Sequence, residues 1–140
     1  MLHRFLIAAV LVLAAGCSKS KSDAPAPSPS PSPSSAHDPT APKPATDPAT
    51  ARTLIANGAV VLDVRSPDEY AGDHVERATN LPVDEVTPRI AEVDKLVGGD
   101  KTKPVVVYCG GGRRAEKAKT QLEAAGYTHV VNGGGLSDLK

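Results

Sequence analysis

Residues 105–114 read VVVYCGGGRR, which is the clearest strand-loop-helix signal in the chain. The β-branched run predicts a buried strand that carries Cys109 at its carboxyl end. Three glycines then permit a tight turn in which backbone N–H groups converge, and the two arginines predict the start of a helix. Helix N-termini and nearby cations favour the thiolate, which is the nucleophilic form of cysteine. The stretch therefore indicates a reactive thiol, and a buried structural cysteine is the alternative.

Strands and helices alternate from about residue 49 to residue 131. Hydrophobic spacing predicts helices at about 49–57, 66–72, 87–97 and 114–125, and strands at about 60–64, 78–81, 104–108 and 129–131. Ser66 and Glu69 have the spacing of a capping box at the start of the second helix. The alternation predicts an α/β fold with a central parallel sheet of four to five strands and helices on both faces.

The buried side of the third helix is predicted from its apolar spacing. Its members are Ile90, Val93, Leu96 and Val97. The last strand is expected to be followed by the glycine triplet at 133–135 and then by a short tail.

Polar residues follow the first strand in the same way that the cysteine loop follows the third. Ligands bind beyond the carboxyl ends of strands in parallel sheets, so residues 63–65 and 109–114 are expected to share one rim. For Asp63 and Arg65 we favour a structural role, with Asp68 or Glu69 as the partner of Arg65, and a functional role at the rim is the alternative. His74 is expected to be structural, because an ionised thiolate needs no general base.

The first 16 residues have the pattern of a bacterial lipoprotein signal peptide. Arg4 precedes an apolar run at 5–15, and small residues lead directly to Cys17. The run is shorter than the roughly 20 residues of a membrane-spanning helix. Cys17 stands where lipoproteins carry the lipidated first residue of the mature chain. An ordinary secretory signal is the alternative.

Residues 17–50 predict a lipidated N-terminus followed by a disordered linker. The linker holds nine of the thirteen prolines and hardly any large apolar residue, so it cannot bury a core. Its composition favours an extended tether, and a ligand for a peptide-binding partner is the alternative. The folded domain is therefore expected at 51–140.

The composition of residues 51–140 restricts the partners of this domain. Twelve Lys and Arg face thirteen Asp and Glu, a net charge of −1 with His neutral, so no overall field attracts nucleic acid. No Cys/His cluster has metal-ligand spacing, and the glycine triplets lack the Lys-Ser or Lys-Thr of a nucleotide-binding loop. We expect no metal, no cofactor and no nucleic-acid partner, and we expect a monomer.

Cysteine use points to function outside the cytoplasm. The sequence has two cysteines, and if Cys17 carries lipid then Cys109 has no partner within the chain. Thiols in extracytoplasmic compartments usually pair. An unpaired, exposed cysteine there is a liability unless its reactivity is used.

Four segments together resemble a rhodanese domain. They read LDVRSPDEY at 62–70, DHV at 73–75, ATNLP at 78–82 and YCGGGRRA at 108–115. The chain is most similar to the small periplasmic thiosulfate sulfurtransferases of the phage-shock type, which share the Tyr before the Cys and a segment like GYTHV at 126–130. The resemblance implies a five-stranded α/β fold and an active Cys109 that carries sulfane sulfur as a persulfide to cyanide or another thiophile.

The chain departs from the family pattern at three points. Asp73 and Arg77 stand where glycines are usual, no clear strand precedes residue 49, and the chain stops at Lys140. Because no clear strand precedes residue 49, the sequence itself predicts only four of the family's five strands.

Thiosulfate is a small dianion, so it requires donors and positive charge around the attacking sulfur. Gly110, Gly111 and Gly112 are expected to supply backbone N–H groups. Arg114 is assigned to the closing position of the loop and Arg113 to its mouth. Two solvated helix-start arginines without a special role are the alternative.

Two other functions compete with sulfur transfer. Cysteine phosphatases and arsenate reductases have a Cys-x5-Arg loop, whereas only four residues separate Cys109 from Arg114 here. A tethered redox-sensing or binding module is the second alternative. The expected enzyme is a thiosulfate sulfurtransferase anchored by lipid in the bacterial cell envelope, at the outer membrane if the cell has one, because Ser18 and not Asp follows Cys17.

Overall fold

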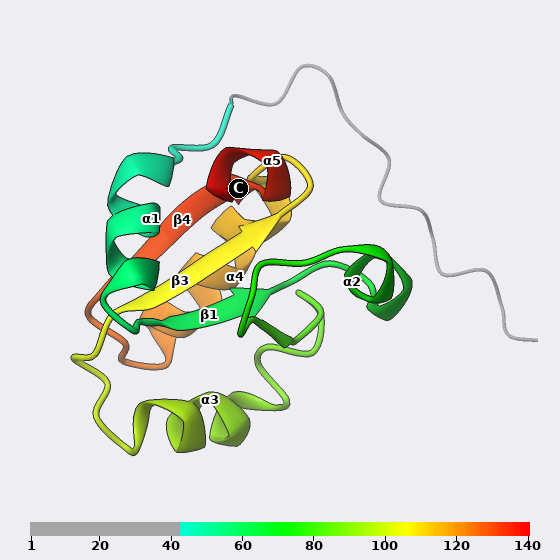
Figure 1. Cartoon of the computed structure of the whole chain (residues 1–140). Coiled ribbons are helices and arrows are strands. Elements are labelled where there is room, and N and C mark those ends of the chain that lie inside the picture. The colour runs from blue at the N-terminus through cyan, green and yellow to red at the C-terminus, as the bar shows by residue number, and fades with distance from the viewer. Residues whose placement is uncertain (1–42) are drawn as a thin grey trace, which may run out of the picture. The chain divides into compact units, whose positions relative to one another are not determined.

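The computed structural model describes residues 43–140 (Figure 1). The signal peptide at 1–16, the lipidation site at Cys17 and most of the predicted linker lie outside the described residues. None of the helices in the described part is long and apolar enough to cross a membrane.

Four parallel strands form the centre of the domain. They are β1 (Val60–Asp63), β2 (Thr79–Asn80), β3 (Val105–Cys109) and β4 (Val130–Gly135). Their order in the sheet is β2-β1-β3-β4, with β1 and β3 side by side. This arrangement confirms the predicted α/β fold and places the ends of β1 and β3 on one rim.

Helices cover both faces of the sheet. The helices are α1 (Pro48–Ala56), α2 (Pro67–Gly72), α3 (Ile90–Val97), α4 (Arg113–Ala124) and α5 (Leu136–Leu139). Figure 1 shows α1 and α5 in front of the sheet and α4 behind it. The capping box predicted for Ser66 and Glu69 is confirmed at the start of α2.

Successive side chains of a strand point to opposite faces, and this alternation divides the core into two clusters. Cys109 joins the cluster under α3 and α4 with Val107 and Leu122. Tyr108 joins the cluster under α1 and α5 with Ala51. The cysteine is therefore packed from the α4 side, and its neighbour in sequence is packed from the other side.

Two details of the sequence prediction are wrong. Leu96 is 43% exposed and does not belong to the buried side of α3. The glycines at 133–135 are part of β4 and do not follow it, because the pairing of β3 with β4 extends to Cys109 and Gly135.

The folded part begins before α1. Residues 44–47, here called the N-terminal strap, run along the end of β4, where the backbone N–H of Asp47 donates to the carbonyl of Asn132 at 2.8 Å. The Asp47 side chain also accepts a hydrogen bond from the Thr50 N–H and caps α1. The domain therefore includes residues that composition assigned to the linker.

Candidate active site

The thiol of Cys109 lies at the base of the loop that joins β3 to α4. Its sulfur accepts hydrogen bonds from the backbone N–H groups of Gly112 at 3.1 Å and Gly111 at 3.5 Å. Converging N–H groups of this kind form an anion-binding concavity. Cys109 is 2% exposed, so it is less accessible than the sequence suggested. The geometry nevertheless directs two backbone N–H groups at the sulfur.

The three loop glycines differ in how much space a larger side chain would have at each position. Gly112 has a left-handed φ of 85°, and a Cβ there would lie 2.7 Å from Thr46 Cγ2 in the strap. A Cβ on Gly110 would lie 3.3 Å from Nη2 of Arg114. A Cβ on Gly111 would meet nothing within 4 Å. Gly112 is therefore required by conformation and packing, while Gly111 faces open space.

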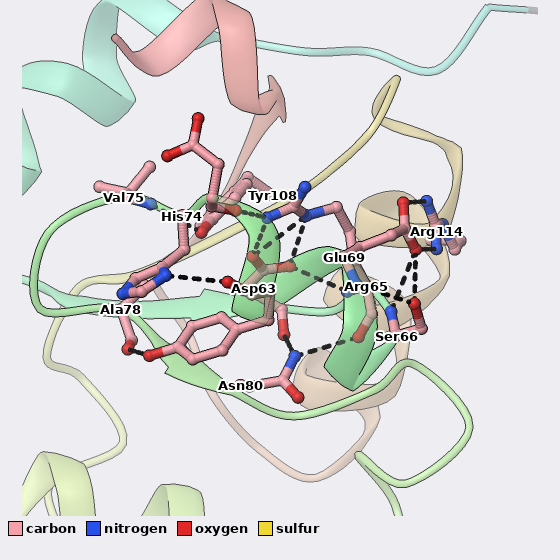
Figure 2. Close-up of polar contacts among 12 residues, drawn as sticks. Asp63, Arg65, Ser66, Glu69, His74, Val75, Ala78, Asn80, Tyr108 and Arg114 are labelled. Atoms are coloured by element: carbon pink, nitrogen blue, oxygen red, sulfur yellow. Dashed lines mark hydrogen bonds and ion pairs between the residues drawn. The ribbon is translucent and has the colours of Figure 1, made fainter.

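Arg114 folds back toward the loop and pairs with Glu69. Its guanidinium donates from Nη1 and Nη2 to the two carboxylate oxygens of Glu69, at 2.6 Å and 2.9 Å (Figure 2). The same carboxylate accepts the Ser66 N–H at 3.1 Å. These bonds, that from Arg114 foremost, lower the pKa of Glu69 to about 2. The pair connects α2 to the closing position of the cysteine loop.

The pKa of Arg114 is raised in turn, chiefly by its hydrogen bond to Glu69. Cys109 makes a smaller contribution in the same direction. The guanidinium is therefore cationic and lies within electrostatic reach of the sulfur.

A buried ion pair stands on the neighbouring strand end. Asp63 is fully buried, and its carboxylate accepts hydrogen bonds from Nε and Nη2 of Arg65 at distances from 2.6 to 3.1 Å (Figure 2). The structural role expected for Arg65 agrees with this contact. The partner expected from the sequence is wrong, because Arg65 pairs with Asp63 and not with Asp68 or Glu69.

Tyr108 lies beneath this ion pair. The Arg65 guanidinium is 5.7 Å from the centre of its ring, and its hydroxyl accepts the backbone N–H of Val75 at 3.0 Å. Burial raises the pKa of Tyr108, so the hydroxyl stays protonated. The residue before the cysteine thus holds the chain segment after α2 against the sheet.

His74 occupies a structural position. Its Nδ1 lies 2.9 Å from the carbonyl oxygen of Tyr70, which can only accept, so Nδ1 carries the proton and donates. The imidazole also stacks on the Tyr70 ring with 4.0 Å between ring centres. These contacts agree with the structural role expected for His74.

Sequence reasoning missed Asn132, which lies in β4 behind the loop. Its Nδ2 donates to the carbonyl of Gly112 at 3.0 Å and to Oε2 of Glu116 at 2.8 Å. The only signal for it in the sequence is a polar residue inside an otherwise apolar strand. The glycines after it also contact the loop, since a Cβ on Gly135 would lie 2.9 Å from the Gly110 carbonyl oxygen.

The structure brings together most of the residues singled out from the sequence. Cys109, the loop at 110–112 and Arg114 form one site, and Arg113 begins α4 beside them. Cys17 lies outside the described residues. Within residues 43–140, no group of three or more His, Cys, Asp or Glu side chains could hold a metal ion.

Comparisons with known proteins agree on one family. A family model described as a rhodanese-like domain matches residues 47–139. The chain is 46% identical over 78 residues to thiosulfate sulfurtransferase PspE of Escherichia coli K12, covering 56% of this chain and 71% of the relative. It is 36% identical over 101 residues to thiosulfate sulfurtransferase 18 of Arabidopsis thaliana, covering 65% of this chain and 73% of the relative.

Solved structures give the same result. A rhodanese with anions from E. coli aligns with a TM-score of 0.52 at 44% identity, covering 58% of this chain and 91% of that chain. The human single-domain sulfurtransferase TSTD1 aligns with a TM-score of 0.51 at 27% identity, covering 66% and 91%.

Proposed function

The chain belongs to the family of rhodanese-like domains, and on that premise we propose that this sulfurtransferase moves the outer sulfur of thiosulfate to a small thiophile through a persulfide on Cys109. The observation that carries the proposal is the sulfur of Cys109 at the focus of the Gly111 and Gly112 N–H groups. Its relatives named thiosulfate sulfurtransferases support thiosulfate as the donor.

The first half of the reaction loads the cysteine. The Cys109 thiolate attacks the outer sulfur of thiosulfate and forms a new S–S bond, while the sulfur-sulfur bond of thiosulfate breaks and sulfite leaves with the electron pair. The negative charge moves from the cysteine sulfur to the terminal sulfur of the persulfide. The Gly111 and Gly112 N–H groups, which donate to the Cys109 sulfur, are proposed to stabilise the attacking thiolate.

The second half of the reaction unloads the cysteine. A thiophile such as cyanide attacks the terminal sulfur, the S–S bond of the persulfide breaks, and the Cys109 thiolate is regenerated as the leaving group. With cyanide the product is thiocyanate. Atoms and electrons balance over the two halves, so no cofactor is required by the chemistry.

Two arginines supply positive charge for a doubly charged donor. Arg114, at the closing position of the loop, is cationic and is held in place by the Glu69 carboxylate, which offsets part of its charge. Arg113 is proposed to attract thiosulfate at the mouth, where it begins α4. Gly110, Gly111 and Gly112 are proposed to contact the bound anion through their backbone.

We also propose that the enzyme works outside the cytoplasm on a tether. The apolar run at 5–15, the small residues before Cys17 and the Pro-rich composition of 18–50 support a lipid-anchored protein of the bacterial cell envelope. The residue after Cys17 is Ser, which favours the outer membrane if the cell has one. Mass analysis of the protein from its native membrane tests the anchor, because a lipidated mature chain begins at Cys17.

The mechanism is tested by intact-mass analysis after treatment with thiosulfate under non-reducing conditions. We expect the mass of one added sulfur atom on the wild type and none on Cys109→Ser. Addition of cyanide is expected to remove that mass and release thiocyanate. A wild type that gains no sulfur would overturn the mechanism.

Two further assays on the same purified protein distinguish sulfur transfer from the competing functions. Cys109-dependent hydrolysis of p-nitrophenyl phosphate without sulfur transfer would instead favour a cysteine phosphatase. Ready oxidation of Cys109 to sulfenic acid without turnover would favour a redox sensor.

A further inference from the structure

Asn132 is a buried amide whose hydrogen-bonding groups are all engaged around the cysteine loop. The residue is 2% exposed, and its Nδ2 donates to the Gly112 carbonyl and to Glu116. Its Oδ1 accepts the N–H of Gly134 at 3.0 Å. The amide can adopt only this orientation, because a flip would set its oxygen against two acceptors and its NH2 against a donor.

Gly112 is the link between Asn132 and the reactive sulfur. Its N–H donates to Cys109 Sγ at 3.1 Å, and its carbonyl accepts from Asn132 Nδ2 at 3.0 Å. The carbonyl also accepts the Glu116 N–H at 2.9 Å, which is the first hydrogen bond of α4. The N–H of Gly112 is therefore bonded to the sulfur, and its carbonyl is bonded to β4 and to the first turn of α4.

A glycine in this position needs external support. Gly112 has no side chain, has a left-handed φ of 85° and precedes a helix that has no side-chain cap at its N-terminus. Glycine moves between backbone conformations at little steric cost, so its φ and ψ angles are restrained by what its N–H and its carbonyl contact. If the carbonyl is released, rotation about these two angles can turn the Gly112 N–H away from the sulfur.

We propose that Asn132 is a positioning residue for sulfur transfer: it fixes the Gly112 carbonyl and thereby keeps the Gly112 N–H directed at Cys109 Sγ. The inference rests on the proposed function for its role in turnover, but the geometry predicts an effect on the thiol itself. Asn132 acts through Gly112 and not by contact with the donor.

The decisive variant exchanges two neighbouring groups. Asn132→Asp combined with Glu116→Gln keeps one carboxylate and one amide in the pair, and the amide introduced on α4 can donate to the carboxylate introduced on β4. The exchange removes the Asn132 donor to the Gly112 carbonyl and leaves the donor from the Glu116 backbone N–H in place. Asn132→Leu is a second variant of similar volume that removes the same donor without introducing a charge at 132.

The readout is the rate at which iodoacetamide alkylates Cys109 at neutral pH, measured beside sulfur transfer and the free energy of unfolding. We expect both variants to slow alkylation and sulfur transfer by roughly tenfold, an effect smaller than the removal of a direct anion-binding donor. Glu116→Gln alone keeps the Asn132 donor and is expected to alkylate at the wild-type rate.

Asn80→Asp is the matched control. The Asn80 amide also donates to two backbone carbonyls at the rim, those of Asp63 and Arg65, at 3.1 and 3.0 Å. We expect this variant to lower the free energy of unfolding without slowing alkylation. The inference is overturned if the exchanged pair and Asn132→Leu are folded and alkylate at the wild-type rate, or if Asn80→Asp slows alkylation equally. Failure of the wild type to transfer sulfur would overturn the proposed function and leave the alkylation comparison intact.

Discussion

Glu69 and Arg114 form a two-pronged ion pair across 45 positions of the sequence, with Nη1 donating to Oε2 at 2.6 Å and Nη2 donating to Oε1 at 2.9 Å. The Glu69 carboxylate is at the same time the second half of the capping box that begins α2. One carboxylate therefore holds both the start of a helix on the β1 side and the arginine that closes the cysteine loop.

This pair predicts a loss of stability in acid. The pKa of Glu69 is lowered from 4.5 to about 2, mainly by Arg114, so its stabilisation is present above about pH 4.5 and is lost as the pH falls toward 2. We expect the free energy of unfolding, measured with urea, to fall more steeply over this range in the wild type than in Glu69→Gln. The difference should be modest and should shrink in high salt, because both side chains are about one-third exposed or more. Parallel curves for the two proteins would contradict the assignment.

Gly112→Ala and Gly111→Ala should differ in stability. An alanine at 112 must adopt a left-handed backbone, which costs roughly 1–2 kcal/mol, and its methyl group would displace Thr46. An alanine at 111 meets open space and has no left-handed φ. We expect chemical denaturation to show a clear loss of stability for Gly112→Ala and little change for Gly111→Ala. Equal losses would contradict the special requirement for glycine at 112, which rests on its left-handed φ and on its contact with the strap.

Removal of one partner from the buried ion pair should be strongly destabilising. Arg65→Met leaves the fully buried Asp63 carboxylate without its cation, and we expect a loss of about 3–5 kcal/mol in the free energy of unfolding. The double variant Asp63→Leu/Arg65→Met removes the unpaired charge and is expected to recover much of that loss. If the double variant is less stable than Arg65→Met, the charge is not what destabilises the single variant.

Arg77→Gly is expected to stabilise the domain. Arg77 is the one non-glycine residue in the described part of the chain with a left-handed φ, 65°. Relief of this strain, which costs roughly 1–2 kcal/mol, should exceed the extra chain entropy that glycine gives the unfolded state, roughly 0.4–1 kcal/mol. Glu76→Gly is the control, because its backbone is not left-handed and glycine there should destabilise. A Tm that falls for both variants would contradict the expectation.

The sequence predicted the elements whose signals are local. The capping box at Ser66 and Glu69 and the strand before Cys109 each depend on residues a few positions apart. The shared rim also followed, because parallel strands must end at the same edge.

Features that depend on contacts between distant segments could not be predicted in the same way. Arg65 was expected to pair along the following helix, yet the burial of Asp63 by the sheet makes that carboxylate its partner. Leu96 has the same helical spacing as the buried residues of α3, but its side chain is exposed. The role of Asn132 requires β4 to lie behind the loop, which no spacing in the sequence reveals.

The N-terminal strap affects where the protein can be shortened. The composition places the end of the linker at residue 50, and the first helix begins at Pro48. Either position would therefore be chosen as the start of a truncated protein. Thr46 and Pro44, however, lie directly against Gly112 at the end of the reactive loop. A truncated protein that starts at Pro48 would contain every helix and strand of the domain and would still lack one wall of its active cysteine loop.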